Sequence, residues 1–300
     1  MFNFYVQLKA NDCGKVQIET PELKIFDKNL QNSIPGQWPW VVSLLLIDNN
    51  FICGSSLISK KHLLSVAHCI QFGNFTLQPR SLYALLGRHN LSDETEENWI
   101  KSNISEIFVH SDYNKSSRSF RSKADISILV LKKVVIFTKF IQPICLPQST
   151  VNTINIDGFV IGYGQNSEDE KPREIAKYFV MHSINPWDCS LLNRSYSKII
   201  SRDSFCARNE NAALCPGDSG SGFEIKNSKS FTLYGLVSQC LNSTNCNPDD
   251  YTVFVDVAKY IHWIYEKTGL KAIVRIVTIL HRIERKFKNK IHFFTEDKIA

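Results

Sequence analysis

The stretch Cys215-Pro-Gly-Asp-Ser-Gly-Ser-Gly222 decides how the rest of this sequence is interpreted. Near its centre Ser219 stands between Asp218 and a glycine. A serine hydroxyl is a weak nucleophile at neutral pH, so it needs a base to take its proton and N–H donors to hold the oxyanion that forms. Gly217 lets the backbone bend so that its own N–H and that of Ser219 face one point. Alone, this segment is explained equally well as an ordinary turn, so its context decides.

That context lies upstream, where two more residues of a catalytic set occur. Ser65-Val-Ala-His68-Cys69 supplies a histidine beside a cysteine, and Ala124-Asp125 supplies an aspartate that opens an apolar run. The order His68, Asp125, Ser219 is one of the chain orders in which a Ser-His-Asp triad occurs. The three residues therefore predict acyl transfer through a serine nucleophile.

Length and composition fit a globular protein of one or two domains. The 300 residues are 43% hydrophobic and 21% charged, with a net charge of +6 that comes largely from the last thirty residues. No apolar run approaches the ~18–20 residues that a membrane-spanning helix needs. The main body has no basic and aromatic pattern of a nucleic-acid binder, so no nucleic-acid partner is predicted.

The cysteines indicate an oxidising compartment. Nine cysteines occur without a Cys-x-x-Cys pair, which favours disulfides and secretion over a metal site. Six sequons agree with secretion and predict N-glycosylation: Asn74, Asn90, Asn103, Asn114, Asn193 and Asn242. The segment Met1–Val6 has no signal-peptide pattern, so we expect the sequence to be part of a longer precursor.

From about Ile25 to Glu266, the chain resembles the trypsin-like (chymotrypsin-fold) serine proteases. Its lead and the Pro35-Gly-Gln-Trp-Pro-Trp40 stretch are similar to arthropod modular serine proteases and clotting-factor-C-like enzymes. The resemblance implies an all-β fold with two packed antiparallel six-stranded barrels and a C-terminal helix. Short apolar runs such as Val41–Ile47 and Ile126–Lys133 read as strands of those barrels. Helical spacing over Val257–Glu266 fits the closing helix.

The resemblance also implies roles and boundaries. His68 is the base, Asp125 its support and Ser219 the nucleophile, while the N–H groups of Gly217 and Ser219 form the oxyanion hole. No cofactor and no metal are implied. Residues 1–24 form a light-chain remnant or propeptide lead, 25–268 the protease domain and 269–300 a basic amphipathic extension.

Activation by cleavage is a further implication of the resemblance. Cleavage after Lys24 would free the amine of Ile25, and this ammonium would pair with buried Asp218 and shape the oxyanion hole. The sequence departs from the family here, because Asp27-Lys28 stand where two glycines are usual. A buried carboxylate without a partner is costly, so the uncut chain should hold this loop differently.

Four disulfides are implied by the resemblance. A bond between Cys13 and Cys145 would keep the lead attached, although Cys13 could equally be a free thiol at a frayed terminus. Cys53 and Cys69 would clamp the segment of His68, and a loop of that size is worth roughly 3 kcal/mol. The other pairs are Cys189 with Cys206 and Cys215 with Cys246. Cys215 with Cys240 is the alternative, and the odd number leaves at least one thiol unpaired.

The residues that resemble the specificity pocket carry no charge. Ala213 and Leu214 stand at its floor, so an unpaired Lys or Arg side chain of a substrate would be disfavoured. Ser238 matches the serine that supports the catalytic aspartate. Cys240 and Thr252 stand where open pockets have glycines, which predicts a shallow pocket for Leu, Val or Ala.

Two acidic or basic segments have competing interpretations. The stretch Ser92–Glu97 lies where some relatives bind calcium, but Arg88 stands at the first ligand position, so a solvated acidic loop is the better interpretation. Residues 271–300 have basic and apolar residues on one possible helix face. This tail could contact an anionic membrane, although packing against the body or a gene-model artefact explains it as well.

The sequence thus predicts a secreted serine endopeptidase made as a zymogen, which cleaves protein substrates after small or medium apolar residues. The resemblance implies a clotting or innate-immune protease cascade. Its partners would be an upstream activating protease and a protein substrate such as a downstream protease zymogen. The main alternative is a catalytically silent protease homologue that acts as an adaptor. A structural glycoprotein with a chance triad is a weaker third interpretation.

Overall fold

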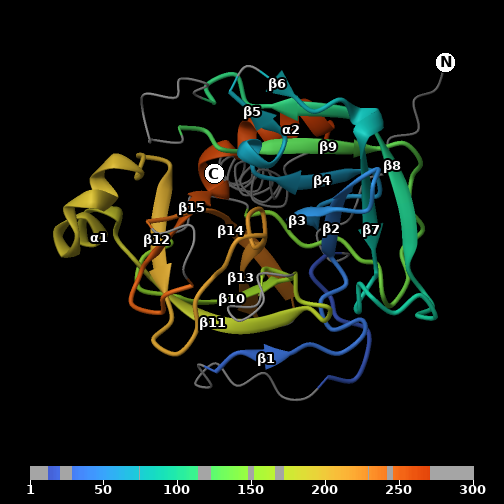
Figure 1. Cartoon of the computed structure of the whole chain (residues 1–300), viewed down its shortest axis with the longest axis horizontal. Coiled ribbons are helices and arrows are strands. Elements are labelled where there is room, and N and C mark those ends of the chain that lie inside the picture. The colour runs from blue at the N-terminus through green and yellow to red at the C-terminus, as the bar shows by residue number, and fades with distance from the viewer. Residues whose placement is uncertain are drawn as a thin grey trace, which may run out of the picture.

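The computed structural model describes residues 13–20, 29–73, 75–113, 123–147, 152–165, 172–228, 230–241 and 246–270. Lys24, Ile25, Asn74, Asn114, Asn242 and the extension from residue 271 lie outside the described residues. Figure 1 shows two barrels side by side, the first on the right and the second at the lower left.

The first barrel is closed in the order β2-β3-β4-β9-β8-β7. All neighbouring pairs of this barrel are antiparallel. Its strands β2 and β9 are short apolar runs whose residues are nearly all buried, as expected for strands inside a packed barrel. The six strands are Val41–Leu46 (β2), Phe51–Leu57 (β3), His62–Ser65 (β4), Leu82–Leu86 (β7), Ile100–Val109 (β8) and Ser127–Leu131 (β9).

The second barrel runs β11-β10-β13-β14-β15-β12, and a β11–β12 pairing closes it. The short strand β1 (Gln31–Asn32) adds to the outside of β11. The six barrel strands are Asp157–Gly162 (β10), Lys177–Ile184 (β11), Ser204–Arg208 (β12), Gly222–Asn227 (β13), Ser230–Cys240 (β14) and Thr252–Asp256 (β15). The predicted fold of two antiparallel six-stranded barrels is confirmed.

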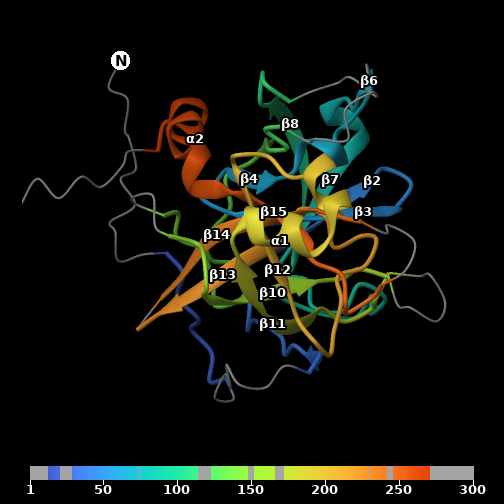
Figure 2. The same cartoon turned by 90° about the vertical axis from the view of Figure 1, so that its left-hand side faces the viewer.

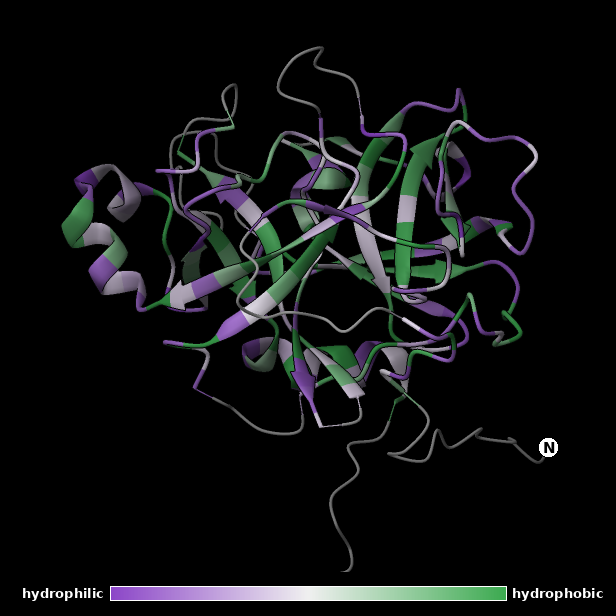
Figure 3. Cartoon of the chain, turned by 90° about the horizontal axis from the view of Figure 1, so that it is seen from below, coloured by the Kyte–Doolittle hydropathy of each residue, from purple (hydrophilic) through white to green (hydrophobic). Residues whose placement is uncertain are grey.

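One hydrophobic core joins the two barrels. Trp38 and Trp40 from the entry to β2 pack against Phe231 of β14 at centroid distances of 5.3 Å, and Trp38 also contacts Phe159 of β10. Aromatic side chains of this size contribute much of the buried apolar area in a core. The core thus fixes one barrel against the other and shapes the cleft between them. Figure 3 shows hydrophobic residues along the strands and polar residues mostly in the connections.

Helices lie outside the barrels. Helix α1 (Pro186–Leu192) begins at Asn185, whose side chain caps it, and the C-terminal helix α2 (Ile261–Thr268) ends at Gly269, where φ is 68°. The predicted closing helix is therefore present, but its first turn is the 3₁₀ helix η4. Figure 2, turned so that α1 faces the viewer, has α2 at the upper left. The remaining elements are η1 (Ala67–Cys69), β5 (Gln71–Phe72), β6 (Phe75–Thr76), η2 (Pro79–Ser81), η3 (Arg194–Lys198) and η4 (Val257–Tyr260).

Four disulfides lie in the described residues, and Cys240 is a free thiol. The pairs are Cys13–Cys145, Cys53–Cys69, Cys189–Cys206 and Cys215–Cys246. Next to the first pair, the N–H of Gly14 donates to the carbonyl of Pro143 at 2.7 Å, so the lead lies against the barrels. Among the described residues, no helix has the length and apolar character to cross a membrane.

Candidate active site

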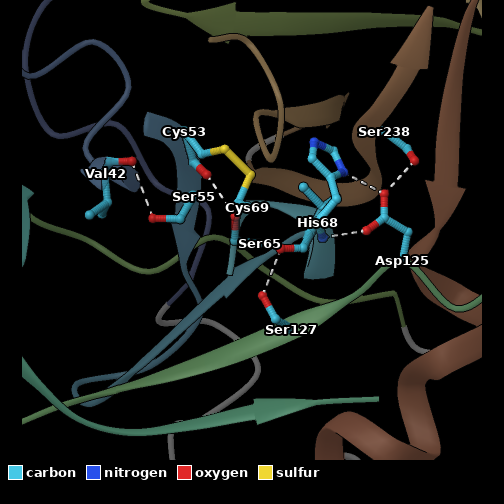
Figure 4. Close-up of a disulfide and its surroundings, with 11 residues drawn as sticks. Val42, Cys53, Ser55, Ser65, His68, Cys69, Asp125, Ser127 and Ser238 are labelled. Atoms are coloured by element: carbon cyan, nitrogen blue, oxygen red, sulfur yellow. Dashed lines mark hydrogen bonds and ion pairs between the residues drawn. A yellow bond between two sulfur atoms is a disulfide. The ribbon is translucent and has the colours of Figure 1, made fainter. Parts of the chain in front are cut away.

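His68 is held from both sides of its short helix. It lies in η1, directly after β4, and the Cys53–Cys69 disulfide joins η1 to β3 (Figure 4). The hydroxyl of Ser127 donates to the carbonyl of Val66 at 3.0 Å, which ties this segment to β9 as well. The histidine is thus fixed to three strands of the first barrel while about 31% of its side chain stays exposed.

Asp125 orients His68 through two hydrogen bonds. The backbone N–H of His68 donates to Oδ1 and the ring Nδ1 pairs with Oδ2, both at 2.8 Å. The hydroxyl of Ser238 also donates to Oδ2, at 2.6 Å (Figure 4). Ser238 is on β14, at a register shift between Val237 and Gln239, and such a bulge turns a side chain out of the sheet. Because Nδ1 carries the proton toward Asp125, Nε2 is left as the base.

The charges of this pair shift both pKa values. Burial alone lowers the pKa of His68, but the Asp125 carboxylate outweighs it, so the pKa is raised above 6.5. Burial alone raises the pKa of Asp125, but the charge and hydrogen bonds of His68 and the Ser238 hydroxyl lower it overall. Asp125 therefore stays ionised and His68 becomes a stronger base than an isolated imidazole.

Ser219 lies on a tight loop between the barrels. Gly217 and Gly220 have φ values of 93° and 81°, a region that favours glycine, and a Cβ at Gly220 would overlap Gly54 and Ser65. The N–H of Gly54 on β3 donates to the carbonyl of Ser219 at 2.8 Å. In the described parts of the chain, the N–H groups of Gly217 and Ser219 donate to no acceptor, as an oxyanion hole requires.

A cleft of about 740 Å³ joins these groups. His68, Gly217 and Ser219 all line it, so the structure brings the predicted base, nucleophile and oxyanion donors to one space. Leu214, Ser238 and Cys240 line it as well, and its surface is mostly apolar. Ala213 and Thr252 are not among the lining residues. Thr252 is buried behind Cys240, with 3.4 Å between its hydroxyl and the thiol.

Asp218 is buried next to the nucleophile, and sequence reasoning missed one of its partners. Its Oδ1 accepts the N–H of Gly164 at 2.7 Å and its Oδ2 that of Cys215 at 2.9 Å. A Cβ at Gly164 would overlap the carboxylate, which explains the glycine at the end of β10. The guanidinium of Arg173 lies 3.5 Å from Oδ2. Burial nevertheless raises the pKa of Asp218, and Arg173 offsets this only in part. No pattern in the sequence distinguishes Arg173 from other basic residues.

The acidic loop near residue 93 has its own buried cation. Arg88 donates to the carbonyl of Asp93, its Nε lies 3.7 Å from Glu96, and its guanidinium stacks 4.3 Å from the Trp99 ring. A guanidinium in this position disfavours a second cation, which agrees with interpreting this loop as one that binds no calcium.

Three of the sequon asparagines are described. Asn103 and Asn193 are exposed and Asn90 is half-buried. The side-chain oxygens of Asn90 and Asn193 accept hydrogen bonds from Ser92 and Ser195, the third residues of their sequons. Exposure makes glycosylation at Asn103 and Asn193 sterically feasible.

Comparison with known proteins gives consistent results. A family model described as Trypsin matches residues 28–264. Serine protease gd of Drosophila melanogaster is 26% identical, covering 82% of this chain and 54% of that protein. Clotting factor G beta subunit of Tachypleus tridentatus is 27% identical over 82% of this chain and 81% of its own length. Chymotrypsin-C of Mus musculus is 29% identical over 87% and 95%. The chain thus spans about half the length of serine protease gd.

Proposed function

This chain belongs to the trypsin family of serine proteases, and we propose that it is an active serine-type endopeptidase. The observation that carries the proposal is the Asp125–His68 pair, which lines the same cleft as Ser219 and the free N–H of Gly217. The same fold can serve other functions, so the argument depends on the site.

The chemistry follows from the positions of these groups. The Oγ of Ser219 attacks the scissile carbonyl while Nε2 of His68 takes its proton. The N–H groups of Gly217 and Ser219 stabilise the oxyanion, and Asp125 stabilises the imidazolium. The C–N bond then breaks as His68 returns the proton to the leaving amine. A water molecule, activated by His68, releases the acyl group and restores Ser219.

We propose that the enzyme cleaves after small or medium apolar residues. Leu214 and the protonated thiol of Cys240 line the cleft, and no described carboxylate lines it. Burial raises the pKa of Cys240 to about 11, so this wall is neutral at physiological pH. A substrate Lys or Arg would find no counter-charge there. Thr252 supports this role from behind Cys240, and Ala213 contributes no wall.

The biological setting is also a proposal. Four disulfides support a secreted protein, as do the exposed sequons at Asn103 and Asn193. By the family resemblance, we propose a zymogen whose cleavage after Lys24 frees Ile25. A clotting factor and a chymotrypsin among the relatives support protein substrates in an extracellular protease cascade. An upstream protease would cut this chain, and a downstream protease zymogen would be its substrate.

A fluorophosphonate probe tests the proposed activity. The protein cut after Lys24 should be labelled on Ser219 and should hydrolyse peptides with Val, Leu or Ala before the cut. Ser219→Ala should abolish labelling, while the matched change Ser221→Ala should retain it. Correctly cut protein that takes no label would favour the adaptor interpretation. Strong cleavage after Lys or Arg would overturn the specificity alone.

A further inference from the structure

Arg173 is fastened beside Asp218 by both its backbone and its side chain. Its N–H donates to the carbonyls of Tyr163 and Gly164 at 3.1 and 3.3 Å. Its Nη1 lies 3.5 Å from Oδ2 of Asp218, and its Nη2 lies 3.6 Å from Sγ of Cys215. Gly164 therefore contacts both members of the pair, because its N–H donates to Asp218 and its carbonyl accepts from Arg173. The arginine is built into the same corner as the carboxylate.

The pair is buried, so its charges depend on one another. The Arg173 side chain is 7% exposed and that of Asp218 is 0% exposed. A guanidinium keeps its charge at any physiological pH, and a buried charge requires a counter-charge. Among the described residues, Asp218 is the carboxylate within ion-pair distance of Arg173. Conversely, Asp218 has a permanent cation that needs no cleavage to appear.

This pairing coexists with an assembled oxyanion hole. With Asp218 turned toward Gly164 and Arg173, the N–H of Asp218 donates to the Cys215 carbonyl and the N–H of Ser221 to that of Asp218, both at 3.0 Å. The loop between them leaves the N–H groups of Gly217 and Ser219 unpaired on the cleft, as described above. The contacts that hold the loop come from within the described residues, and the amine of Ile25 is not among them.

We propose that Arg173 is a positioning residue that replaces the Ile25 ammonium in the uncut chain, so that the single-chain protein already hydrolyses peptide bonds. This inference rests on the proposed protease function and changes what cleavage after Lys24 does. Cleavage then supplies a second cation for Asp218 and raises an existing activity rather than creating one. The protein is a leaky zymogen because its own chain neutralises the carboxylate that other proteases neutralise by cleavage.

The test uses the full chain made uncleavable by Lys24→Gln. With a chromogenic peptide that ends in Val or Leu, its kcat should lie within about tenfold of that of the cut protein. Adding Arg173→Ala should lower kcat of the uncut chain on the order of 100-fold with little change in KM, which is the size of effect of losing an oxyanion donor. Arg173→Lys should restore part of the loss, and the exposed control Arg202→Ala should have no effect.

The cut protein separates failure of the inference from failure of the proposed function. Cut protein carrying Arg173→Ala should recover activity, because the freed Ile25 amine can then pair with Asp218. If the cut parent protein is inactive, the protease proposal fails. If the cut parent is active but the Lys24→Gln protein is more than about 100-fold slower, the inference is wrong. A gain of uncut activity in Arg173→Ala would make Arg173 a latch, which also overturns it. If Arg173→Ala fails to fold, the Lys24→Gln measurement alone still decides.

Discussion

Asp125 and Asp218 stand at the two sides of one catalytic loop, and they respond to burial in opposite ways. Both carboxylates are 0% exposed. Asp125 opens β9 of the first barrel and accepts three hydrogen bonds of 2.6–2.8 Å, two from His68 and one from Ser238. Asp218 belongs to the loop before β13 of the second barrel and accepts two from backbone N–H groups, with Arg173 at 3.5 Å. The pKa of Asp125 is lowered and that of Asp218 is raised.

The difference shows that burial alone does not decide the state of a carboxyl group. The number of close donors and the distance of the cation decide it. The partners also differ in kind, because His68 exchanges protons and Arg173 does not. One aspartate therefore serves proton transfer, and the other serves the geometry of the loop that carries Ser219.

The largest effect is expected when the proton-transfer side is broken. Asp125→Asn should lower kcat about 10⁴-fold, because an amide that donates to Nδ1 imposes the wrong histidine tautomer. Steady-state kinetics on the cut protein measure this loss. Ser238→Ala removes one of the three hydrogen bonds and should cost much less. A loss below about tenfold in Asp125→Asn would mean that Asp125 does not orient His68 during the reaction.

Breaking the geometric side should reduce activity less and stability more. Asp218→Asn should lower kcat roughly 10²–10³-fold and the free energy of unfolding by about 3–5 kcal/mol, since it leaves Arg173 buried without a counter-charge. Urea unfolding at neutral pH measures the stability. The double change Asp218→Asn with Arg173→Gln should regain part of that stability. If the double variant is less stable than the single one by the full sum, the two side chains are not coupled.

The pH dependence tests the His68–Asp125 pair directly. His68 must be neutral to accept the Ser219 proton, so kcat/KM should fall as the pH drops through its pKa. Because Asp125 raises that pKa, the midpoint of the acid limb should lie above 6.5. Asp125→Asn removes the carboxylate and should move the midpoint down. A midpoint below 6.5 in the parent protein would contradict the assigned pairing.

The smallest effect is expected at Glu224, a third buried carboxyl that has neither kind of partner. It is 0% exposed, and neither oxygen accepts a hydrogen bond from the described residues. Burial raises its pKa well above 4.5, and the Trp40 indole hardly offsets this. Its contribution to stability is therefore complete below pH 4.5 and is lost as the pH rises toward the folded-state pKa.

Glu224→Gln stays neutral and should escape that loss. The stability difference between variant and parent should grow with pH above 4.5, by up to about 1.4 kcal/mol for each pH unit. Thermal unfolding at several pH values measures it. Exposed Glu210→Gln is the matched control and should give a difference that does not change with pH. A constant difference for Glu224 would show that its carboxyl titrates normally.

Much of the barrel architecture was predictable because local residues carry its signals. Apolar runs such as Val41–Leu46 fold as buried strands wherever a core is available, and glycines at 217 and 220 are required by backbone angles that other residues rarely adopt. Resemblance to known proteases identified His68, Asp125 and Ser219. The pocket was predicted less well, because whether Ala213 or Thr252 reaches the cleft depends on how neighbouring loops pack.

By itself, the sequence determined the family, the order of the catalytic residues and the disulfide-rich character of this protein, since each of these resides in residue types and their order. Only the tertiary structure decided that Arg173 faces Asp218, that Glu224 is buried without a partner and that Ser238 reaches Asp125. Ion pairing and desolvation depend on distance and burial in space, and residues far apart along the chain acquire both only when the barrels close.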